Sequence, residues 1–224
     1  MCGRIVWVWD PITGEMLRKI VDDPEQDPDV VHVLHKQRYN VPPASHVPVI
    51  DGRGAPRMAV ARWGFPIPQR PNGVFNTRIE TAAESPMWRG LIGKSHCLFP
   101  VAGFYEWRRS GKQRVPFYIH RADGRPLLLG GLVQDRRVDG MGTTCASIVT
   151  CAPNAMMATV HDRMPVVVEE ADAAAWLAGN AFDLAVPAGD VLIKHQVGPD
   201  VGDTKNDRPE LMQPVGQQGL GAFG

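Results

Sequence analysis

The chain has 224 residues, of which 44% are hydrophobic and 21% are charged, a composition typical of globular proteins. The length allows one large domain or two small ones and is ample for a sizeable core. No run of 18 apolar residues predicts a membrane helix, and no basic segment followed by an apolar stretch predicts a secretory signal.

Eight apolar runs, separated by turns rich in proline and glycine, predict short strands. In chain order they are residues 3–9, 46–50, 57–65, 96–107, 115–120, 126–133, 145–151 and 164–168. Four other stretches predict helices, at residues 13–21, 85–93 (with Ser85 as N-cap), 152–163 and 169–179.

The predicted strands dominate, and the helices do not alternate with them strictly. This arrangement predicts an α+β protein: a single domain built on a mixed or antiparallel sheet with a few short helices. We expect the domain to span residues 1–214 and the glycine-rich residues 215–224 to form a flexible tail.

The four cysteines, Cys2, Cys97, Cys145 and Cys151, do not resemble the disulfide framework of a secreted domain. No CxxC pair occurs, so the sequence predicts no metal site, and no motif indicates a cofactor. A reducing cytoplasm is therefore the expected location, and we expect a monomer.

The net charge of zero conceals an asymmetry along the chain. Residues 57–125 contain twelve Lys or Arg against four Asp or Glu, whereas residues 169–190 contain five acids and no base. A positive face would suit a polyanion such as nucleic acid, although solvated charge explains most such runs.

Cys2 stands directly behind the initiator methionine. Removal of Met1 would leave an α-amine and a thiol on adjacent carbons, a 1,2-aminothiol that no internal cysteine can offer. Because chain ends usually fray at the surface, a buried structural thiol is not expected here, and the alternative is a chance cysteine at a loose end.

Two titratable residues occupy positions suited to proton transfer. Glu106 is flanked by Phe104, Tyr105 and Trp107, which would desolvate its carboxylate and favour the protonated form near neutral pH. The alternative is an outward-facing carboxylate on an alternating strand. His161, at a predicted helix-to-strand junction, could shuttle protons or could be an ordinary structural histidine.

Asn76 and Arg78 are separated by one residue, so on a strand their side chains point to the same side. The planar guanidinium of Arg78 suits a phosphate, and a structural ion pair with Glu80 is the alternative.

Several short motifs, taken together, are specific for one protein family. In chain order, they are MCGR, RYNVPP, RWGF, FNTRIETAAE, CLFPVAGFYEW, PFYIH and VHDRMPVVV. Through these motifs the chain resembles the SRAP family of SOS-response-associated peptidases, also called abasic-site processing proteins. The resemblance extends from residue 1 to about residue 214. It implies binding to single-stranded DNA that contains an abasic site.

The resemblance also implies a covalent reaction. After loss of Met1, the α-amine of Cys2 would attack the aldehyde of the opened sugar, and the thiol would close a thiazolidine that shields the lesion. An α-amine has a pKa near ~8, so a useful fraction is neutral at pH 7, unlike an ordinary lysine. The thiol then attacks within the same molecule, where effective molarities can reach ~10⁵ M.

The matching motifs assign further roles. Asn76 would orient the Cys2 terminus, Arg78 would hold the phosphate beside the lesion, Glu106 would relay protons, and His161 would act on the Schiff base and its reversal. The resemblance offers two additional phosphate contacts, Arg4 and Arg163.

The sequence departs from the family in the loop before Asn76, which has no tryptophan after Trp63. Phe65 or Trp88 is expected to replace this base wedge by stacking. Two other functions stay open at this point: a thiol peptidase with an N-terminal nucleophile acting on other proteins, and a non-covalent single-strand binder. The family name implies autoproteolytic removal of Met1, which methionine aminopeptidase could equally perform.

Overall fold

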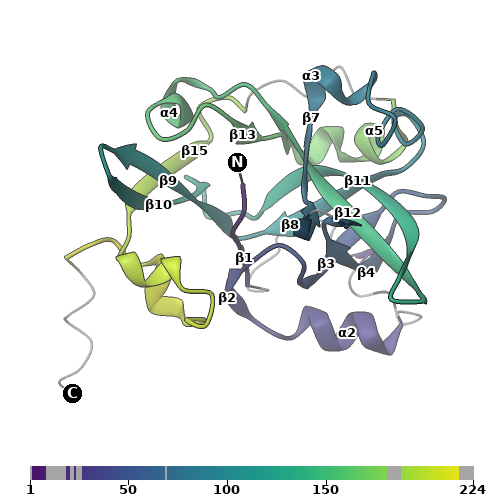
Figure 1. The fold of residues 1–224 in the computed structure, drawn as a ribbon, viewed down its shortest axis with the longest axis horizontal. Coiled ribbons are helices and arrows are strands. Elements are labelled where there is room, and N and C mark those ends of the chain that lie inside the picture. Colours follow the sequence, from purple (N-terminus) through teal and green to yellow (C-terminus); the bar gives the residue numbers. More distant parts are fainter. Residues whose placement is uncertain are drawn as a thin grey trace.

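The computed structural model describes residues 2–8, 19–20, 23, 27–68, 70–180 and 188–216. They form a single domain of mostly sheet with a few short helices, as Figure 1 shows. This architecture confirms the predicted α+β class. None of the described helices is long and apolar enough to cross a membrane.

The larger sheet has eight strands and closes on itself. Its strands are β3 (His46–Asp51), β4 (Arg57–Trp63), β7 (Asn76–Arg78), β8 (His96–Val101), β11 (Leu127–Val138), β12 (Met141–Cys151), β13 (Met164–Pro165) and β14 (Val167–Val168). Pairing runs from β12 through β4, β3, β8 and β11 back to β12, so these five strands form a ring without a free edge. The sheet is mixed, because β12 is parallel to β4 and β7.

The second sheet has five strands in the order β15-β10-β9-β1-β2. Their bounds are β1 (Ile5–Trp7), β2 (Arg38–Val41), β9 (Gly103–Ser110), β10 (Gln113–Arg121) and β15 (Leu192–Gln196). The N-terminal strand β1 therefore lies inside the sheet, antiparallel to β9 on one side and to β2 on the other. A separate hairpin pairs β5 (Phe65–Ile67) with β6 (Arg70–Val74).

The helices whose bounds lie within the described residues are short. They are α2 (Pro28–Leu34), α3 (Ile79–Ala82), α4 (Ala155–Ala158) and α5 (Ala173–Leu177), with 3-10 turns η1 (Glu170–Asp172), η3 (Pro199–Gly202) and η4 (Pro209–Met212). The prediction at 169–179 is confirmed as η1 followed by α5, whereas only residues 155–158 of the helix predicted at 152–163 are helical, as α4. The prediction at 13–21 lies outside the described residues except for Lys19 and Ile20, which are helical.

The helix predicted at 85–93 is wrong, because this segment forms successive hydrogen-bonded turns. The Ser85 hydroxyl does accept from the backbone N–H of Met87 at 3.3 Å, as a cap would. Gly90 and Gly93 within so short a segment disfavour a continuous helix, and Gly93 has a positive φ of 74°.

Sequence reasoning missed α2 and the strands β2, β6 and β15. Helix α2 did have a signal, because Asp27 caps it by accepting from the N–H of Asp29 at 2.9 Å, and Pro28 opens it. Val30 and Leu34, four residues apart, provide its buried face. Residues 217–224 of the predicted tail lie outside the described part of the chain.

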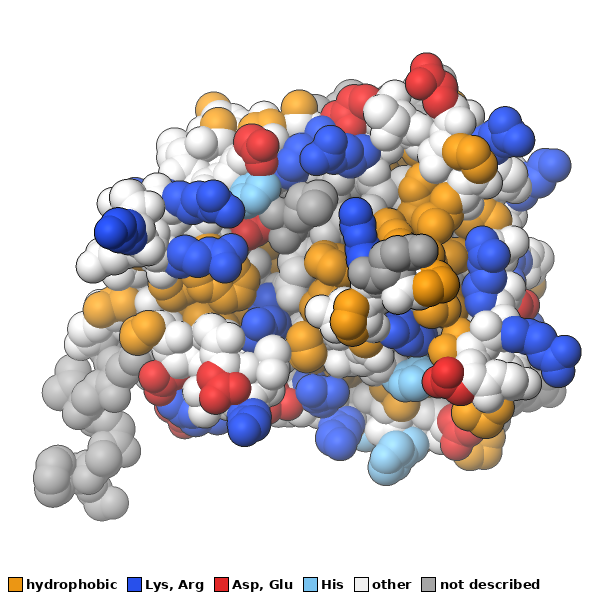
Figure 2. Space-filling view, viewed as in Figure 1, with side chains coloured by type: hydrophobic (Ala, Val, Ile, Leu, Met, Phe, Trp, Pro, Cys, Tyr) orange, Lys and Arg blue, Asp and Glu red, His pale blue; other side chains and the backbone are white. Residues whose placement is uncertain are grey.

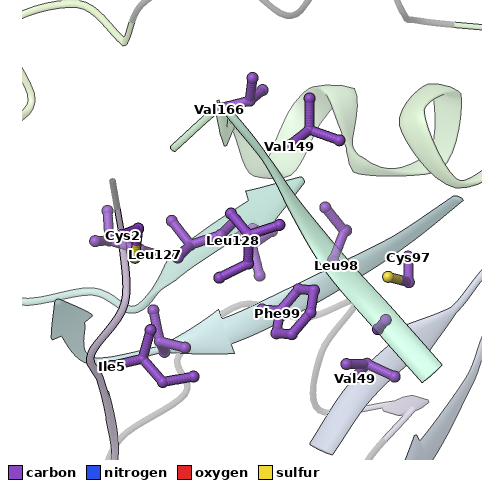
Figure 3. Close-up of a cluster of buried hydrophobic side chains, with 14 of the residues drawn as sticks. Cys2, Ile5, Val49, Cys97, Leu98, Phe99, Leu127, Leu128, Val149 and Val166 are labelled. Atoms are coloured by element: carbon purple, nitrogen blue, oxygen red, sulfur yellow. The ribbon is translucent and has the colours of Figure 1, made fainter. Parts of the chain in front are cut away.

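Strand β8 is a nearly continuous apolar run because both of its faces are covered. All six residues of β8 are buried, and Figure 3 shows Leu98 and Phe99 in this core with Val49 and Leu127. Helix α5 closes one side through Trp176, which is fully buried and whose Nε1 donates to the carbonyl of Cys97 at 2.9 Å.

A glycine in β11 makes this packing possible. A Cβ added at Gly130 would lie 2.5 Å from the ring of Trp176. Gly130→Ala should therefore lower the free energy of unfolding by about 1–3 kcal/mol, the usual cost of overpacking. Gly142→Ala is the matched control in the next strand, where nothing lies within 4 Å of the added Cβ. Urea denaturation of both variants tests this, and equal stabilities would refute the proposed contact.

Candidate active site

Cys2 is built into the core. Its side chain is 1% exposed, and Figure 3 shows it beside Leu127 in the cluster that also contains Ile5. The expectation of a loose, exposed end is therefore wrong. The reason is the pairing of the strand that follows, in which Ile5 lies opposite Phe104 on β9 and Val41 on β2.

Asn76 contacts Cys2 directly. Its Nδ2 donates to the carbonyl oxygen of Cys2 at 2.8 Å, across 74 residues of sequence. Strand β7 places it there, because Asn76 pairs in parallel register with Ile148 of β12. The other amide atom, Asn76 Oδ1, is buried and has no hydrogen-bond partner among the described residues. It is therefore available to accept from a donor near the Cys2 terminus.

Glu106 is buried, with 4% of its surface exposed. The outward-facing alternative is thus wrong, because both faces of β9 are covered at this point and Tyr105 is also buried. The backbone N–H of Trp107 donates to Glu106 Oε2 at 3.1 Å. Burial, and secondly the charge of Glu106, raise the pKa of the Cys2 thiol well above its usual value. Cys2 is consequently held as the neutral thiol.

His161 follows α4 and is about a quarter exposed. Its backbone N–H donates to the Met157 carbonyl at 2.9 Å. The backbone N–H of Arg163 lies 3.0 Å from His161 Nδ1 and donates to this nitrogen when it carries no proton. The carboxylate of Asp162 lies 2.8 Å from the same Nδ1 and forms an ion pair when the ring is charged.

Glu106 and His161 line one cleft of about 1380 Å³, which Gly3 and Arg4 also line. Its rim carries three arginines that sequence reasoning did not single out: Arg108, Arg109 and Arg114. The basic run after Trp107 was the available signal. Figure 2 shows Lys and Arg side chains gathered over the β9–β10 hairpin and elsewhere on this face.

Arg78 and Arg163 differ in their surroundings. Glu80 pairs with Arg163 at 2.6 Å, so the ion pair of Glu80 with Arg78 that the sequence left open is not formed. Arg163 also donates to the Thr150 carbonyl at 2.6 Å, and its side chain is 13% exposed. Arg78 is exposed, and its side chain forms no hydrogen bond or ion pair with the described residues.

Arg4 is also engaged within the protein. Its Nη1 donates to Asn40 Oδ1 at 2.6 Å and to the Val201 carbonyl at 2.8 Å, while its guanidinium lies 5.6 Å from the Trp107 ring centre. Asn40, from the motif RYNVPP, is fully buried and donates to the carbonyls of Val201, Asp203 and Asn206. It joins the N-terminal strand to the segment that contains η3.

The expected stacking by Phe65 or Trp88 is wrong. Phe65 is 1% exposed and Trp88 is 6% exposed, and the two rings pack edge to face with centroids 4.8 Å apart. Among the described residues, no group of three or more His, Cys, Asp or Glu is arranged to hold a metal ion.

The chain is similar to known proteins in sequence and in fold. The chain is 30% identical over 230 residues to abasic site processing protein YedK of Escherichia coli, covering 96% of this chain and 100% of YedK. It is 29% identical over 190 residues to abasic site processing protein YoqW of Bacillus subtilis, covering 78% and 85% of the two chains. A solved structure from Bacteroides thetaiotaomicron shares the fold, with a TM-score of 0.74 at 21% identity over 88% of this chain and 95% of that one.

The model of one protein family, SOS response associated peptidase (SRAP), matches residues 1–204, and the match includes all the residues gathered around Cys2. By this match and by its likeness to YedK, the chain belongs to the SRAP family.

Proposed function

We propose that this protein processes abasic sites by forming a covalent crosslink between Cys2 and the lesion in single-stranded DNA, which shields the lesion. The observation that carries the proposal is the convergence of three distant segments on the N-terminus. Asn76 binds the Cys2 carbonyl, the charge of Glu106 acts on the Cys2 thiol, and His161 shares a cleft with Glu106. The names of the relatives YedK and YoqW supply the abasic site as the substrate.

The reaction starts when Met1 has been removed and Cys2 carries a free α-amine. The family's designation as a peptidase fits autoproteolytic removal, and methionine aminopeptidase offers a second route. The amine adds to the aldehyde of the ring-opened sugar, and loss of water gives an imine. The Cys2 sulfur then bonds to the imine carbon, and the thiol proton ends on the nitrogen. The product is a five-membered thiazolidine.

The residues around Cys2 supply what these steps need. The Cys2 thiol is neutral at rest, so a base must take its proton when sulfur attacks. We assign this role to Glu106, because its charge contributes to the raised pKa of the thiol. The same carboxyl group can deliver a proton to the sugar oxygen during ring opening. His161 presents Nε2 for proton transfer at the imine, and Asn76 holds the backbone that carries the amine.

The DNA partner would lie along the basic rim of the cleft. Arg78 is exposed and free to contact the phosphate beside the lesion, and we assign the same role to Arg108, Arg109 and Arg114 of the β9–β10 hairpin. Arg4 lines the cleft, whereas Arg163 pairs with Glu80 and Thr150, and we assign both arginines positioning roles because of their intramolecular bonds. A single strand is favoured because the aldehyde must reach a recessed N-terminus, which base pairing would hinder.

Cys2→Ser should abolish the heat-stable thiazolidine but leave an imine that borohydride can trap, because the amine remains. Extra residues in front of Cys2 should abolish both products, because the amine is then an amide. The measurement is a denaturing gel after incubation with abasic single-stranded DNA, with intact mass confirming loss of Met1. Cys145→Ser, which alters another buried thiol, serves as the control.

This assay also separates the alternatives. A thiol peptidase or a non-covalent binder gives no heat-stable band with DNA, and a Cys2→Ser protein that still forms one would contradict the assignment of the nucleophile.

Arg78→Ala should weaken binding to single-stranded DNA and reduce the salt slope by about 0.7, the value for one phosphate contact. Arg163→Ala should instead lower the unfolding free energy and slow crosslinking, because it breaks the bonds to Glu80 and Thr150. Binding titrations at several salt concentrations distinguish the two. An unchanged slope for Arg78→Ala would remove the proposed phosphate contact.

Glu106→Gln and His161→Ala should slow different steps of the reaction. Glu106→Gln keeps the size of the side chain but loses proton transfer, so adduct formation should slow by roughly 10²-fold or more. His161→Ala should still bind DNA but should slow both the imine-dependent steps and the release of a preformed adduct.

Two time courses test these roles: adduct formation, and exchange of a preformed adduct onto excess competitor DNA. Formation by Glu106→Gln at the wild-type rate between pH 6 and pH 8 would make the carboxylate structural. A His161→Ala protein that matches wild type in both time courses would show that this histidine has no part in the chemistry.

A further inference from the structure

We propose that Lys194 is a positioning residue that fixes His161 relative to Glu106, so that both groups face the same lesion. The proposal rests on the proposed function, and it concerns a residue that no sequence motif singled out. Lys194 belongs to β15, at the outer edge of the five-stranded sheet, and it is half-buried.

The ammonium of Lys194 binds the end of α4. Its Nζ donates to the carbonyl oxygen of Met156 at 3.2 Å and to the hydroxyl of Thr159. Thr159 is the C-cap of α4 and also donates its hydroxyl to the Met156 carbonyl at 2.8 Å. A lysine at this point satisfies groups that the helix end leaves open. His161 follows only two residues after Thr159.

The other side of Lys194 packs on the strands that carry Glu106. Its Nζ lies 5.5 Å from the centre of the Phe117 ring, and Phe117 is the register partner of Glu106 across the β9–β10 pair. Lys194 itself pairs with Ile119 of β10. One side chain therefore bridges the sheet that holds Glu106 and the segment that holds His161.

The segments directly before and directly after His161 are thus both held by side-chain contacts. Upstream, Lys194 fixes Met156 and Thr159. Downstream, the N–H of Arg163 orients the ring through Nδ1, and Arg163 is itself fixed by Glu80. Helix α4 has only four residues and little stability of its own, so these external bonds, with the Asn154 cap and the burial of Met157, fix where His161 lies.

The surroundings of Lys194 favour this role over a phosphate contact. Two donor directions of the ammonium are occupied by protein oxygens, and the Phe117 ring lies near it. Burial, and secondly the nearby charge of Arg108, lower the pKa of Lys194. The neighbouring Arg108 and Arg114 reach the cleft directly.

The first test needs no DNA. Imidazole ¹⁵N chemical shifts of His161 are compared in wild type, Lys194→Met, Lys194→Arg and Thr159→Val. Thr159→Val keeps the charge of Lys194 but removes one of its acceptors, so it should shift the His161 signals in the same way as Lys194→Met. Lys194→Arg should stay close to wild type. Lys36→Met, which removes an exposed lysine beyond α2, is the matched control and should change nothing.

The second test measures exchange of a preformed adduct at saturating DNA. Lys194→Met and Thr159→Val should slow exchange by about 10-fold to 10²-fold, the scale of a misplacement near 1 Å, without changing the salt slope of DNA binding. The double variant should be no slower than Lys194→Met alone, because both changes break one interaction.

Unchanged His161 signals in Lys194→Met and Thr159→Val would overturn the proposal. So would a reduced salt slope for Lys194→Met with no effect of Thr159→Val, which is the behaviour of a phosphate contact. If wild type forms no adduct, the proposed function fails, and the chemical shifts measured without DNA still decide whether Lys194 positions His161.

Discussion

The pairing of β1 between β9 and β2 is the constraint on which the rest of the site depends. A chain end has no covalent neighbour on one side, so only noncovalent contacts can hold it in place. Here the strand beginning at Ile5 has partners on both sides, Arg4 is bonded to the buried Asn40, and Asn76 binds the Cys2 carbonyl. These contacts bring the N-terminus to a fixed position beside Glu106.

Burial gives the site its resting state. The desolvated Cys2 thiol has a raised pKa, so sulfur stays protonated and weakly reactive until a base acts on it. In the proposed reaction, the amine generated by loss of Met1 would react first, and the thiol would follow within the same molecule. Glu106 would then act as the base that activates the neutral thiol when sulfur attacks.

Around the Cys2 site, three polar side chains form hydrogen bonds that join distant segments of the chain. Asn40 joins β2 to the segment containing η3, Arg163 joins Glu80 to the end of β12, and Lys194 joins β15 to α4. Each is a buried or half-buried donor whose loss would leave carbonyls or carboxylates unpaired, at a cost of about 1–3 kcal/mol each. The side chain of Arg78 lacks such bonds, and the hairpin arginines line the cleft, which is why the proposal assigns phosphate contacts to them.

The α+β class and most of the strands were determined by the sequence itself. The reason is that strand formation by apolar runs between proline and glycine turns depends on the local pattern of residues. The sequence motifs also named Cys2, Asn76, Glu106 and His161, and their order along the chain identified the family. The sequence could not show that Cys2 is buried, that Glu80 pairs with Arg163 instead of Arg78, or that Phe65 and Trp88 pack against each other. Nor could it show that Lys194 reaches α4. These facts were decided only by the tertiary structure, because each depends on side chains brought together from distant strands, and periodicity carries no information about which strands become neighbours.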